Sequence, residues 1–188
     1  MKLENEEDII QQIKNDAWMM EILKTARTLE LPDWWICAGF VRSKIWDELH
    51  GGDKRTEMAD IDVVYFDKRN TDESAEKRLE NILIELLPNV PWSVKNEARM
   101  HLRNNVDPYI STIDAIAKFP ETATALGVKL DETGELCLTA PHGVQDVLDL
   151  VVRPTPLFKS SNKLMENYLK RIQDKKWHEK WNKVTYSD

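Results

Sequence analysis

Residues 59–66 read Ala-Asp-Ile-Asp-Val-Val-Tyr-Phe, which places two aspartates one residue apart inside an apolar stretch. Valine, isoleucine, tyrosine and phenylalanine favour strands, so the stretch predicts a buried or half-buried strand. Side chains two residues apart on a strand point to the same face, about 6.6 Å apart along the chain. Burial and mutual repulsion make the charged forms of Asp60 and Asp62 costly there, and a hard divalent cation such as Mg²⁺ would remove both problems. The alternative is a strand end whose two acids cap a turn or pair with lysines.

A second stretch, residues 34–52, predicts a strand, a tight turn and a helix. A short apolar run ends in Ala38-Gly39, and apolar residues then recur at near-helical spacing until Gly51, a natural helix stop. Gly39 lets the backbone come close to a ligand, and the free N–H groups at the start of a helix suit a phosphate. Arg42, in the first turn, would add a fork of donors, unless it lies on the surface of an ordinary strand–helix turn. The apolar positions of this helix are Phe40, Val41, Ile45, Trp46 and Leu49.

Together the two stretches resemble the nucleotidyltransferase superfamily of DNA polymerase beta, and in particular the head domain of CCA-adding enzymes and bacterial poly(A) polymerases. The signature of that head domain is Gly-Gly-x-Val-Arg-Asp, a short helix and then Asp-x-Asp. The chain has Ala38 in place of the first glycine and Ser43 in place of the aspartate of the first motif. The matching residues are Gly39, Val41, Arg42, Asp60 and Asp62.

Over roughly residues 30–185 the chain is also similar to a family of uncharacterised bacterial nucleotidyltransferase-like proteins. Those proteins carry comparable Gly-x-Val-Arg, Asp-x-Asp-Val-x-Tyr-x-Asp and Asn-x-Ala-Arg-Met-His segments. Here the three segments occupy residues 39–42, 60–67 and 96–101.

The resemblance implies an α+β fold of the polymerase-beta palm type, with a mixed sheet of about five strands flanked by helices. It also implies transfer of a nucleoside monophosphate from an NTP to a hydroxyl acceptor, with two Mg²⁺ ions, or Mn²⁺ in their place, held by carboxylates. Asp60 and Asp62 would hold the metal. The triphosphate would be bound by Gly39, Phe40, Val41 and Arg42.

The same resemblance implies a third catalytic and metal-binding carboxylate on a neighbouring strand. The next candidate strand is residues 92–97, so Glu97 is our first choice for this acid. The alternative for Glu97 is an exposed acid at the start of a helix. Asp67 is the second choice as a ligand, or else a turn residue. Three further acids remain open, namely Asp114, Asp131 and Asp149.

Polar residues gather around the same segment. Arg99 and His101 are candidates for contacting a phosphate or a base, although a lone histidine is more often a surface residue. Asn96 belongs to the same cluster, and Lys95 and Arg103 are also consistent with a solvated face. We expect the polar loop of residues 53–56 to lie near the substrate.

The length of 188 residues fits one domain, residues 1–188, with a core at about 30–155. We expect a long helix over residues 5–29 and a last helix over residues 160–181 to pack on that core. The chain is too short to add the neck, body and tail with which CCA-adding enzymes grip tRNA. Its net charge of −7 argues against strong stand-alone nucleic-acid binding, despite a net +4 over residues 159–188.

The two cysteines show neither a zinc-binding spacing nor a disulfide framework, and Cys37 fits a core position. The acidic amino terminus does not resemble a signal peptide, and no apolar run approaches the ~20 residues of a membrane span. We therefore expect a cytoplasmic protein.

The remaining pattern predicts helices at residues 71–87 and 111–125, a hairpin of residues 127–130 and 135–139, and a short helix from residue 143. Trp18, Trp35 and Trp46 fit core positions, while Trp177 and Trp181, at i and i+4, are expected to dock the last helix. The inward positions of the helix at 71–87 are predicted to be Leu79, Ile82, Leu83, Leu86 and Leu87.

Two other functions remain open at the level of the sequence. One is a catalytically inactive nucleotide-binding or partner-binding protein on the same fold. The other is a toxin–antitoxin type nucleotidyltransferase that modifies a protein or tRNA. The sequence does not choose the NTP, the acceptor (small molecule, RNA or protein) or the oligomeric state.

Overall fold

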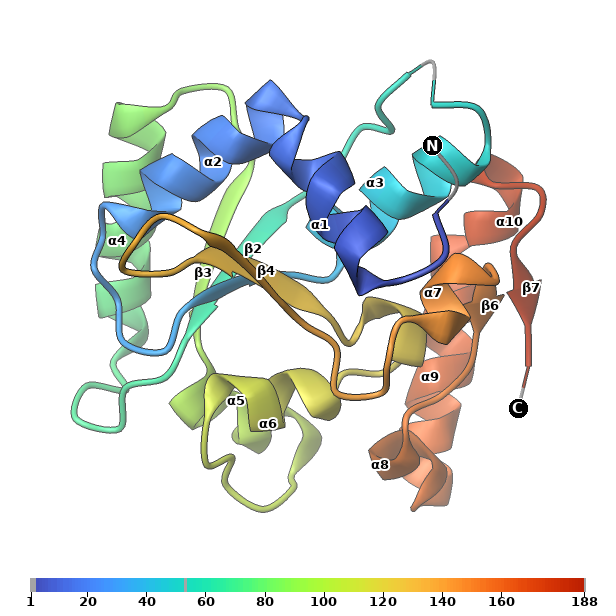
Figure 1. The fold of residues 1–188 in the computed structure, drawn as a ribbon. Helices are drawn as coiled ribbons and strands as arrows, with labels where there is room; N and C mark the ends of the chain where they lie inside the picture. Colours follow the sequence, from blue (N-terminus) through green and yellow to red (C-terminus); the bar gives the residue numbers. More distant parts are fainter. Residues whose placement is uncertain (1–2, 53, 188) are drawn as a thin grey trace.

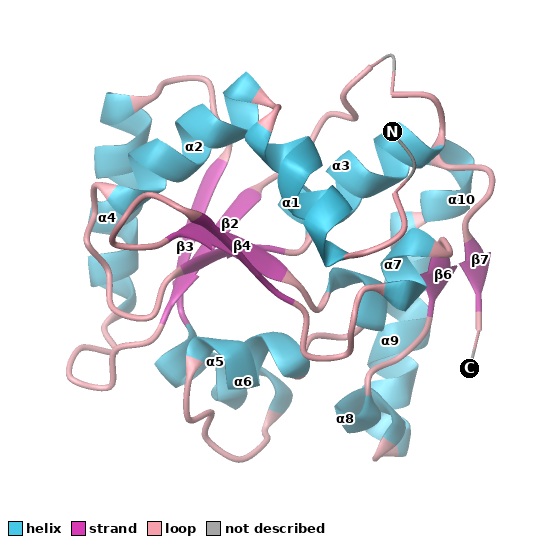
Figure 2. Ribbon diagram, viewed as in Figure 1, coloured by secondary structure: helices cyan, strands magenta, loops and turns pink. Residues whose placement is uncertain are grey.

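The computed structural model describes residues 3–52 and 54–187, so Asp53 of the predicted polar loop lies outside the described residues. A mixed five-stranded sheet runs in the order β3-β2-β1-β4-β5 (Figure 2). Strands β2 and β3 are parallel, and the other neighbours are antiparallel. This arrangement confirms the predicted α+β class and mixed sheet. The strands are β1 Trp35–Cys37, β2 Ile61–Tyr65, β3 Trp92–Asn96, β4 Gly127–Leu130 and β5 Leu136–Thr139.

Helices cover both faces of this sheet, as Figure 1 shows. One face, with Ile61 and Val63, belongs to the main hydrophobic core beneath α1 Glu6–Lys14 and α2 Ala17–Arg27. The other face, with Val64, forms a smaller apolar cluster near α6 Thr112–Ala117. Because side chains alternate along a strand, Asp62 points to this second face together with Val64.

The predicted helix over residues 5–29 is wrong as a single element. Asp16 adopts an extended backbone and its carboxylate accepts a hydrogen bond from the Met19 backbone N–H at 3.1 Å, which makes Asp16 the cap of α2. The chain therefore bends between α1 and α2. Asparagine and aspartate at 15 and 16 favour caps over helix interiors, and this local preference overrides the amphipathic period.

The last predicted helix, over residues 160–181, is also divided. It consists of α9 Asn162–Lys175 and α10 Trp177–Lys180, separated by Lys176 in the left-handed region at φ 45°. The predicted docking is confirmed, because Trp177 and Trp181 are both 3% exposed and both contact the Trp46 ring edge-on. A two-stranded parallel sheet of β6 Val151–Val152 and β7 Thr185–Tyr186 flanks these helices.

The helix predicted at 111–125 is shorter than expected. Helix α6 ends at Ala117, and a 3₁₀ helix, η1 Thr122–Thr124, follows after Pro120, which cannot continue an α-helix. The hairpin of β4 and β5 is confirmed, and the short helix from 143 is α7 Gln145–Leu148. A further short helix, α8 Pro156–Lys159, precedes α9.

Helix α4 Glu73–Leu86 has a narrower buried side than predicted. Leu83 is fully buried, but Ile82 and Leu86 are 44% and 55% exposed, so their inward assignment is wrong. The helix packs beside β3, which is an edge strand of the sheet, so only a thin strip of the helix contacts other elements. Glu76 lies in that strip and is fully buried.

In the described part of the chain, no helix is long and apolar enough to cross a membrane.

Candidate active site

The site begins at the turn between β1 and α3 Gly39–Leu49. Ala38 stands there with φ 53°, a conformation that is strained for a residue with a side chain. Its carbonyl accepts hydrogen bonds from the backbone N–H groups of Val41 and Arg42 at 3.2 and 2.9 Å, which starts the helix. No side chain caps this helix. The side chains of Phe40 and Val41 are fully buried, so these residues present only their backbone to the turn.

The predicted acids come from two adjacent strands. Asp60 directly precedes β2, Asp62 is its second residue, and Asp62 is paired with Ser93 on the parallel strand β3. Glu97 follows β3 as the first residue of α5 Glu97–Asn104. Asp60, Asp62 and Glu97 all line one cavity of about 560 Å³. Glu97 does start a helix, but it is 5% exposed and therefore not the exposed acid of the alternative interpretation.

Burial and neighbouring carboxylates raise the pKa of both Glu97 and Asp62. Burial, followed by the charges of Asp62 and Glu76, raises the pKa of Glu97 to about 8. Burial, followed by the charge of Asp60, also raises the pKa of Asp62, although a hydrogen bond from Ser93 opposes the shift. The structure therefore concentrates carboxyl groups where their charged forms are unfavourable without a cation.

The donor set fits a hard cation, since it consists of carboxylate oxygens. Among the described residues, however, no three His, Cys, Asp or Glu side chains lie close enough together to hold a metal ion by themselves. Mg²⁺ is commonly held by one or two carboxylates together with substrate phosphates and water. The pair Asp60 and Asp62 meets that requirement, whereas Glu97 does not complete a three-ligand cluster in this conformation.

The other acids considered for the third position lie outside this cavity. Asp67 pairs with Arg69 at 3.0 Å and is a turn residue. Asp114 pairs with Lys118 at 2.9 Å. Asp131 accepts hydrogen bonds within the β4–β5 turn, and Asp149 terminates α7.

Arg42 is 8% exposed, so the alternative of a surface arginine is wrong. Its guanidinium carbon lies 5.1, 4.7 and 5.5 Å from the ring centroids of Trp46, Trp177 and Trp181, which we call the tryptophan cage. One terminal nitrogen donates to the Ser43 hydroxyl at 3.2 Å, but the buried Nε has no hydrogen-bond partner among the described residues. Burial lowers the pKa of Arg42 to about 10, so the group remains charged at neutral pH.

The side chains of the polar cluster at 96–101 contact other parts of the protein. The Asn96 side chain donates to the Asp67 and Asn70 carbonyls at 2.7 and 2.8 Å. Arg99 donates to both carboxylate oxygens of the buried Glu76, at 2.6 and 2.7 Å. The His101 ring contacts that of Tyr109. All these residues face the protein itself, and none of the three from the cluster lines the cavity.

Sequence reasoning missed several basic residues of the site. Lys95 and Arg103, interpreted as a solvated face, line the 560 Å³ cavity together with Lys118 and Arg171. Alternation along β3 carries the signal for Lys95, which is two residues from both Ser93 and Glu97. No local sequence pattern indicates Arg171, because its ion-pair partner Glu121 is 50 residues away in the sequence. The two side chains lie 2.6 Å apart in the fold.

A second, smaller compartment of about 110 Å³ adjoins the cavity. Ala38, Asp60, Asp62 and Arg171 border both spaces. The smaller compartment adds the helix start with Gly39, Arg42 and Ser43, the segment 56–59, and residues of α9 and α10. Thr56, from the predicted substrate loop, is fixed here by two hydrogen bonds to the Asp47 carboxylate, at 2.6 and 2.8 Å.

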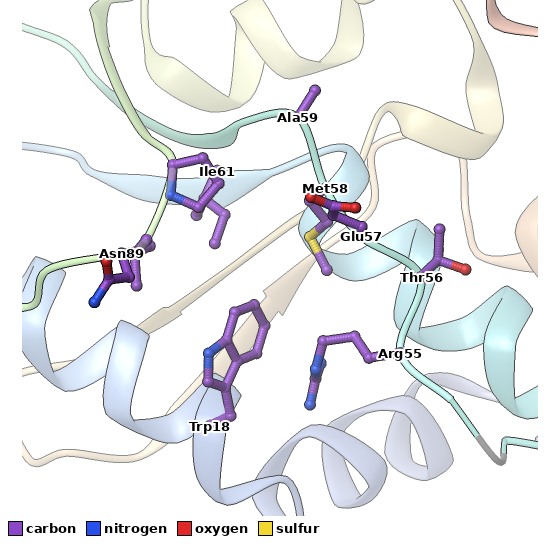
Figure 3. Close-up of a pocket in the computed structure, with 10 residues that line it drawn as sticks. Trp18, Arg55, Thr56, Glu57, Met58, Ala59, Ile61 and Asn89 are labelled. Atoms are coloured by element: carbon purple, nitrogen blue, oxygen red, sulfur yellow. The ribbon is translucent and has the colours of Figure 1, made fainter.

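The segment 55–59 also borders a separate cleft of about 630 Å³, shown in Figure 3. Here Arg55 lies beside Trp18, with its guanidinium carbon 4.1 Å from the ring centroid. Both oxygens of Asp16 accept hydrogen bonds from Arg55, at 2.8 and 2.7 Å. The arginine of this cleft is therefore already paired with a carboxylate, unlike Arg42.

This fold, with its acids beside a strand–turn–helix junction, defines a nucleotidyltransferase-type protein. A family model described as nucleotidyltransferase matches residues 24–186, and the chain belongs to that family. A solved structure described as revealing a CCA-adding enzyme head domain is 35% identical, with a TM-score of 0.89 and coverage of 99% of this chain and 97% of that one.

More distant structures share the fold alone. A CCA-adding enzyme in complex with CTP is 14% identical with a TM-score of 0.59, and the match covers 100% of this chain and 44% of that one. The Thermotoga maritima CCA-adding enzyme complexed with tRNA is 14% identical with a TM-score of 0.57, covering 98% and 43%. The chain thus spans less than half the length of these enzymes. Comparison with curated proteins gave no match.

Proposed function

We propose that this protein transfers a nucleoside monophosphate from an NTP to a hydroxyl acceptor in a metal-dependent reaction. Membership in the nucleotidyltransferase family supports nucleotidyl transfer in general. The observation that carries the finer proposal is the position of Asp60 and Asp62 on the border of both spaces. The smaller space is also lined by Arg42, whose buried Nε has no acceptor among the described residues. Negative groups for a metal and a positive group for a phosphate thus meet at one place.

In this proposal the start of α3 and the Arg42 guanidinium hold and orient the triphosphate. Phosphate oxygens would accept from the Arg42 Nε that lacks a partner, and from the N–H groups of the uncapped helix. The 560 Å³ cavity on the other side of Asp60 and Asp62 would receive the nucleoside and the acceptor hydroxyl. Burial of the reacting groups would exclude water, which strengthens each electrostatic contact.

Asp60 and Asp62 would hold the metal through their carboxylate oxygens. When bound, Mg²⁺ would neutralise charge on the phosphates and stabilise the attacking and leaving oxygens of an in-line displacement. Glu97 would join them once deprotonated, because a nearby divalent charge lowers the pKa that burial has raised.

A catalytically inactive nucleotide-binding protein is the second candidate. It is favoured by the absence of a three-ligand metal cluster among the described residues and by the raised pKa of Glu97. The two candidates differ in turnover and agree in nucleotide binding.

The test is a calorimetric titration of the protein with each NTP and MgCl₂, repeated with Mn²⁺, alongside an assay of pyrophosphate release. Metal-dependent binding that is lost in Asp60→Asn/Asp62→Asn supports the nucleotide site, and release of pyrophosphate supports the enzyme. Binding without any release favours the inactive candidate. No binding of any NTP with either metal would rule out both.

A further inference from the structure

We propose that α9 and α10 supply a phosphate-binding arm, consisting of Arg171, Lys175 and Lys180, that holds the terminal phosphates of the nucleotide opposite the acid pair. The inference rests on the proposed function and adds residues to its site. Sequence patterns pointed only to the start of α3, more than 120 positions earlier in the chain.

The arm is held in place by packing. The left-handed Lys176 turns the chain between α9 and α10, so that Trp177 and Trp181 reach back to the Arg42 guanidinium. The Trp181 Nε1 donates to Asp47 Oδ1 at 2.8 Å, and the same carboxylate fixes Thr56. The arm and the segment leading to Asp60 are thus tied to one aspartate of α3. Figure 1 shows α10 beside α3, although the two are far apart in the sequence.

Charges are divided between the two sides of the 110 Å³ compartment. Carboxylates come from the segment 57–62, with Glu57, Asp60 and Asp62. Cations come from Arg42 and from the arm. Such an arrangement suits a metal–phosphate ligand, because the metal binds the carboxylate side and the phosphates bind the cationic side.

Within the described residues, the lysines of the arm have no ion-pair partner. Lys175 and Lys180 are exposed and make no ion pair with any residue that the structure describes. The neighbouring Lys176, by contrast, pairs with Glu179 at 3.1 Å and does not line the compartment. In the part of the chain that the structure describes, these lysines lack an ion-pair partner and the buried Nε of Arg42 lacks an acceptor, and phosphate oxygens would supply both.

The dimensions agree with this assignment. At about 110 Å³ this compartment is about a fifth of the size of the adjoining cavity, so we assign the smaller part of the nucleotide, the phosphate chain, to it. The adjoining cavity of about 560 Å³ has room for the nucleoside. Arg171 lines both spaces. Its Nε donates a hydrogen bond to the Glu121 carboxylate, so its terminal nitrogens are the groups available to a ligand.

The experiment compares the wild type with Lys175→Gln/Lys180→Gln and with the control Lys163→Gln/Lys170→Gln. The control changes two exposed lysines of α9 that do not line either space, so the net charge of both variants is the same. The probes are inorganic pyrophosphate and ATP, each with MgCl₂, followed by calorimetry. Tryptophan fluorescence gives a second readout, because the cage residues Trp177 and Trp181 lie at the start of α10 and directly after its end.

We expect the arm variant to lose about tenfold in affinity for both probes, and the control to stay within twofold of the wild type. The affinity of the arm variant should also depend less on salt. Equal losses in the arm variant and the control, or none in either, overturn the arm while leaving the nucleotide site intact. If the wild type itself binds neither pyrophosphate nor any NTP, the proposed function fails together with the arm. Equal melting temperatures of the three proteins show that binding alone has changed.

Discussion

Two strand-to-helix junctions lie in the same sheet, and their arginines have opposite surroundings. At the β1–α3 junction no described side chain caps the helix, and a buried nitrogen of Arg42 has no hydrogen-bond partner among those residues. At the β3–α5 junction Asn96 caps the helix through the Ala98 N–H, and Arg99 is fully engaged by Glu76. We infer from this difference that Arg99 stabilises the fold, whereas Arg42 is available to the proposed ligand.

The largest effect is expected from the acids beside the β1–α3 junction. Asp60→Asn/Asp62→Asn removes the charges that would hold the metal, so transfer should fall on the order of 10³-fold or more. Asp67→Asn is the matched control, since Asp67 follows the same strand but pairs with Arg69. Pyrophosphate release measures both variants, and similar activities for the two would refute the role of the pair.

Replacing Arg42 and Arg99 by glutamine, each in a separate variant, tests the comparison of the two junctions directly. Arg42→Gln should weaken NTP binding about tenfold or more, because it removes a buried guanidinium whose charged donors would bind the phosphates. Arg99→Gln should leave binding within twofold but lower the free energy of unfolding by about 3 kcal/mol, because it leaves the buried Glu76 poorly compensated. Calorimetry and urea unfolding separate the two effects. Weakened binding in Arg99→Gln with normal stability would contradict this division.

Glu97 predicts a pH dependence of stability in metal-free protein. Its pKa of about 8 in the folded state exceeds the usual 4.5, so between these pH values the folded state keeps a proton that the unfolded state loses. The free energy of unfolding contributed by this group therefore falls as pH rises from 4.5 to 8. Glu97→Gln should remove that loss, leaving stability unchanged near pH 4.5 and raising it by roughly 2 kcal/mol or more at pH 8.

Thermal unfolding in the presence of EDTA, across this pH range, provides the measurement for Glu97. Melting curves of the variant and the wild type that stay the same distance apart at every pH would show that Glu97 does not carry the raised pKa. Adding MgCl₂ at pH 7 should narrow the difference between the two proteins if the metal binds the ionised acid.

The smallest effect on the fold is expected at Gly39. A Cβ added there would lie 3.7 Å from an Arg42 nitrogen, an ordinary contact, so Gly39→Ala should change stability by less than about 1 kcal/mol. NTP binding should nevertheless weaken, because the methyl group occupies the approach of a phosphate. Gly127→Ala is the contrasting control, since its Cβ would meet the Cys37 Sγ at 2.9 Å and lower stability. Unchanged NTP affinity in Gly39→Ala would remove this glycine from the site.

Local pattern was enough to predict the parts of the fold that depend on short spacing. The alternation in β2, the β4–β5 hairpin and the strand–turn–helix at Ala38 were all confirmed. The breaks at Asp16 and Lys176 were missed, because single residues there override a longer amphipathic period. The exposure of Ile82 was missed because it depends on which strand lies at the edge of the sheet.

The shared face of Asp60 and Asp62 could be predicted from the period of one strand, whereas Glu97 was chosen because the resemblance implies an acid on the neighbouring strand. The contacts of Arg42 with the tryptophan cage could not be predicted from the sequence, because the three tryptophans stand at positions 46, 177 and 181. Arg171 and Glu121 illustrate the same limit, since only the folded chain brings them within 2.6 Å. The hydrogen bonds from Arg99 to Glu76 could not be predicted either, because Glu76 belongs to a different helix.

The tryptophan cage has a consequence for the order in which the molecule forms. Its rings join α3 to α10 across more than 130 residues, and contacts so distant in sequence close slowly because a large loop must first be restricted. The sheet and the Ala38 turn can form before these contacts exist. A burial signal from Trp177 and Trp181 should therefore mark the last phase of refolding, and competence to bind phosphate should arise in that phase.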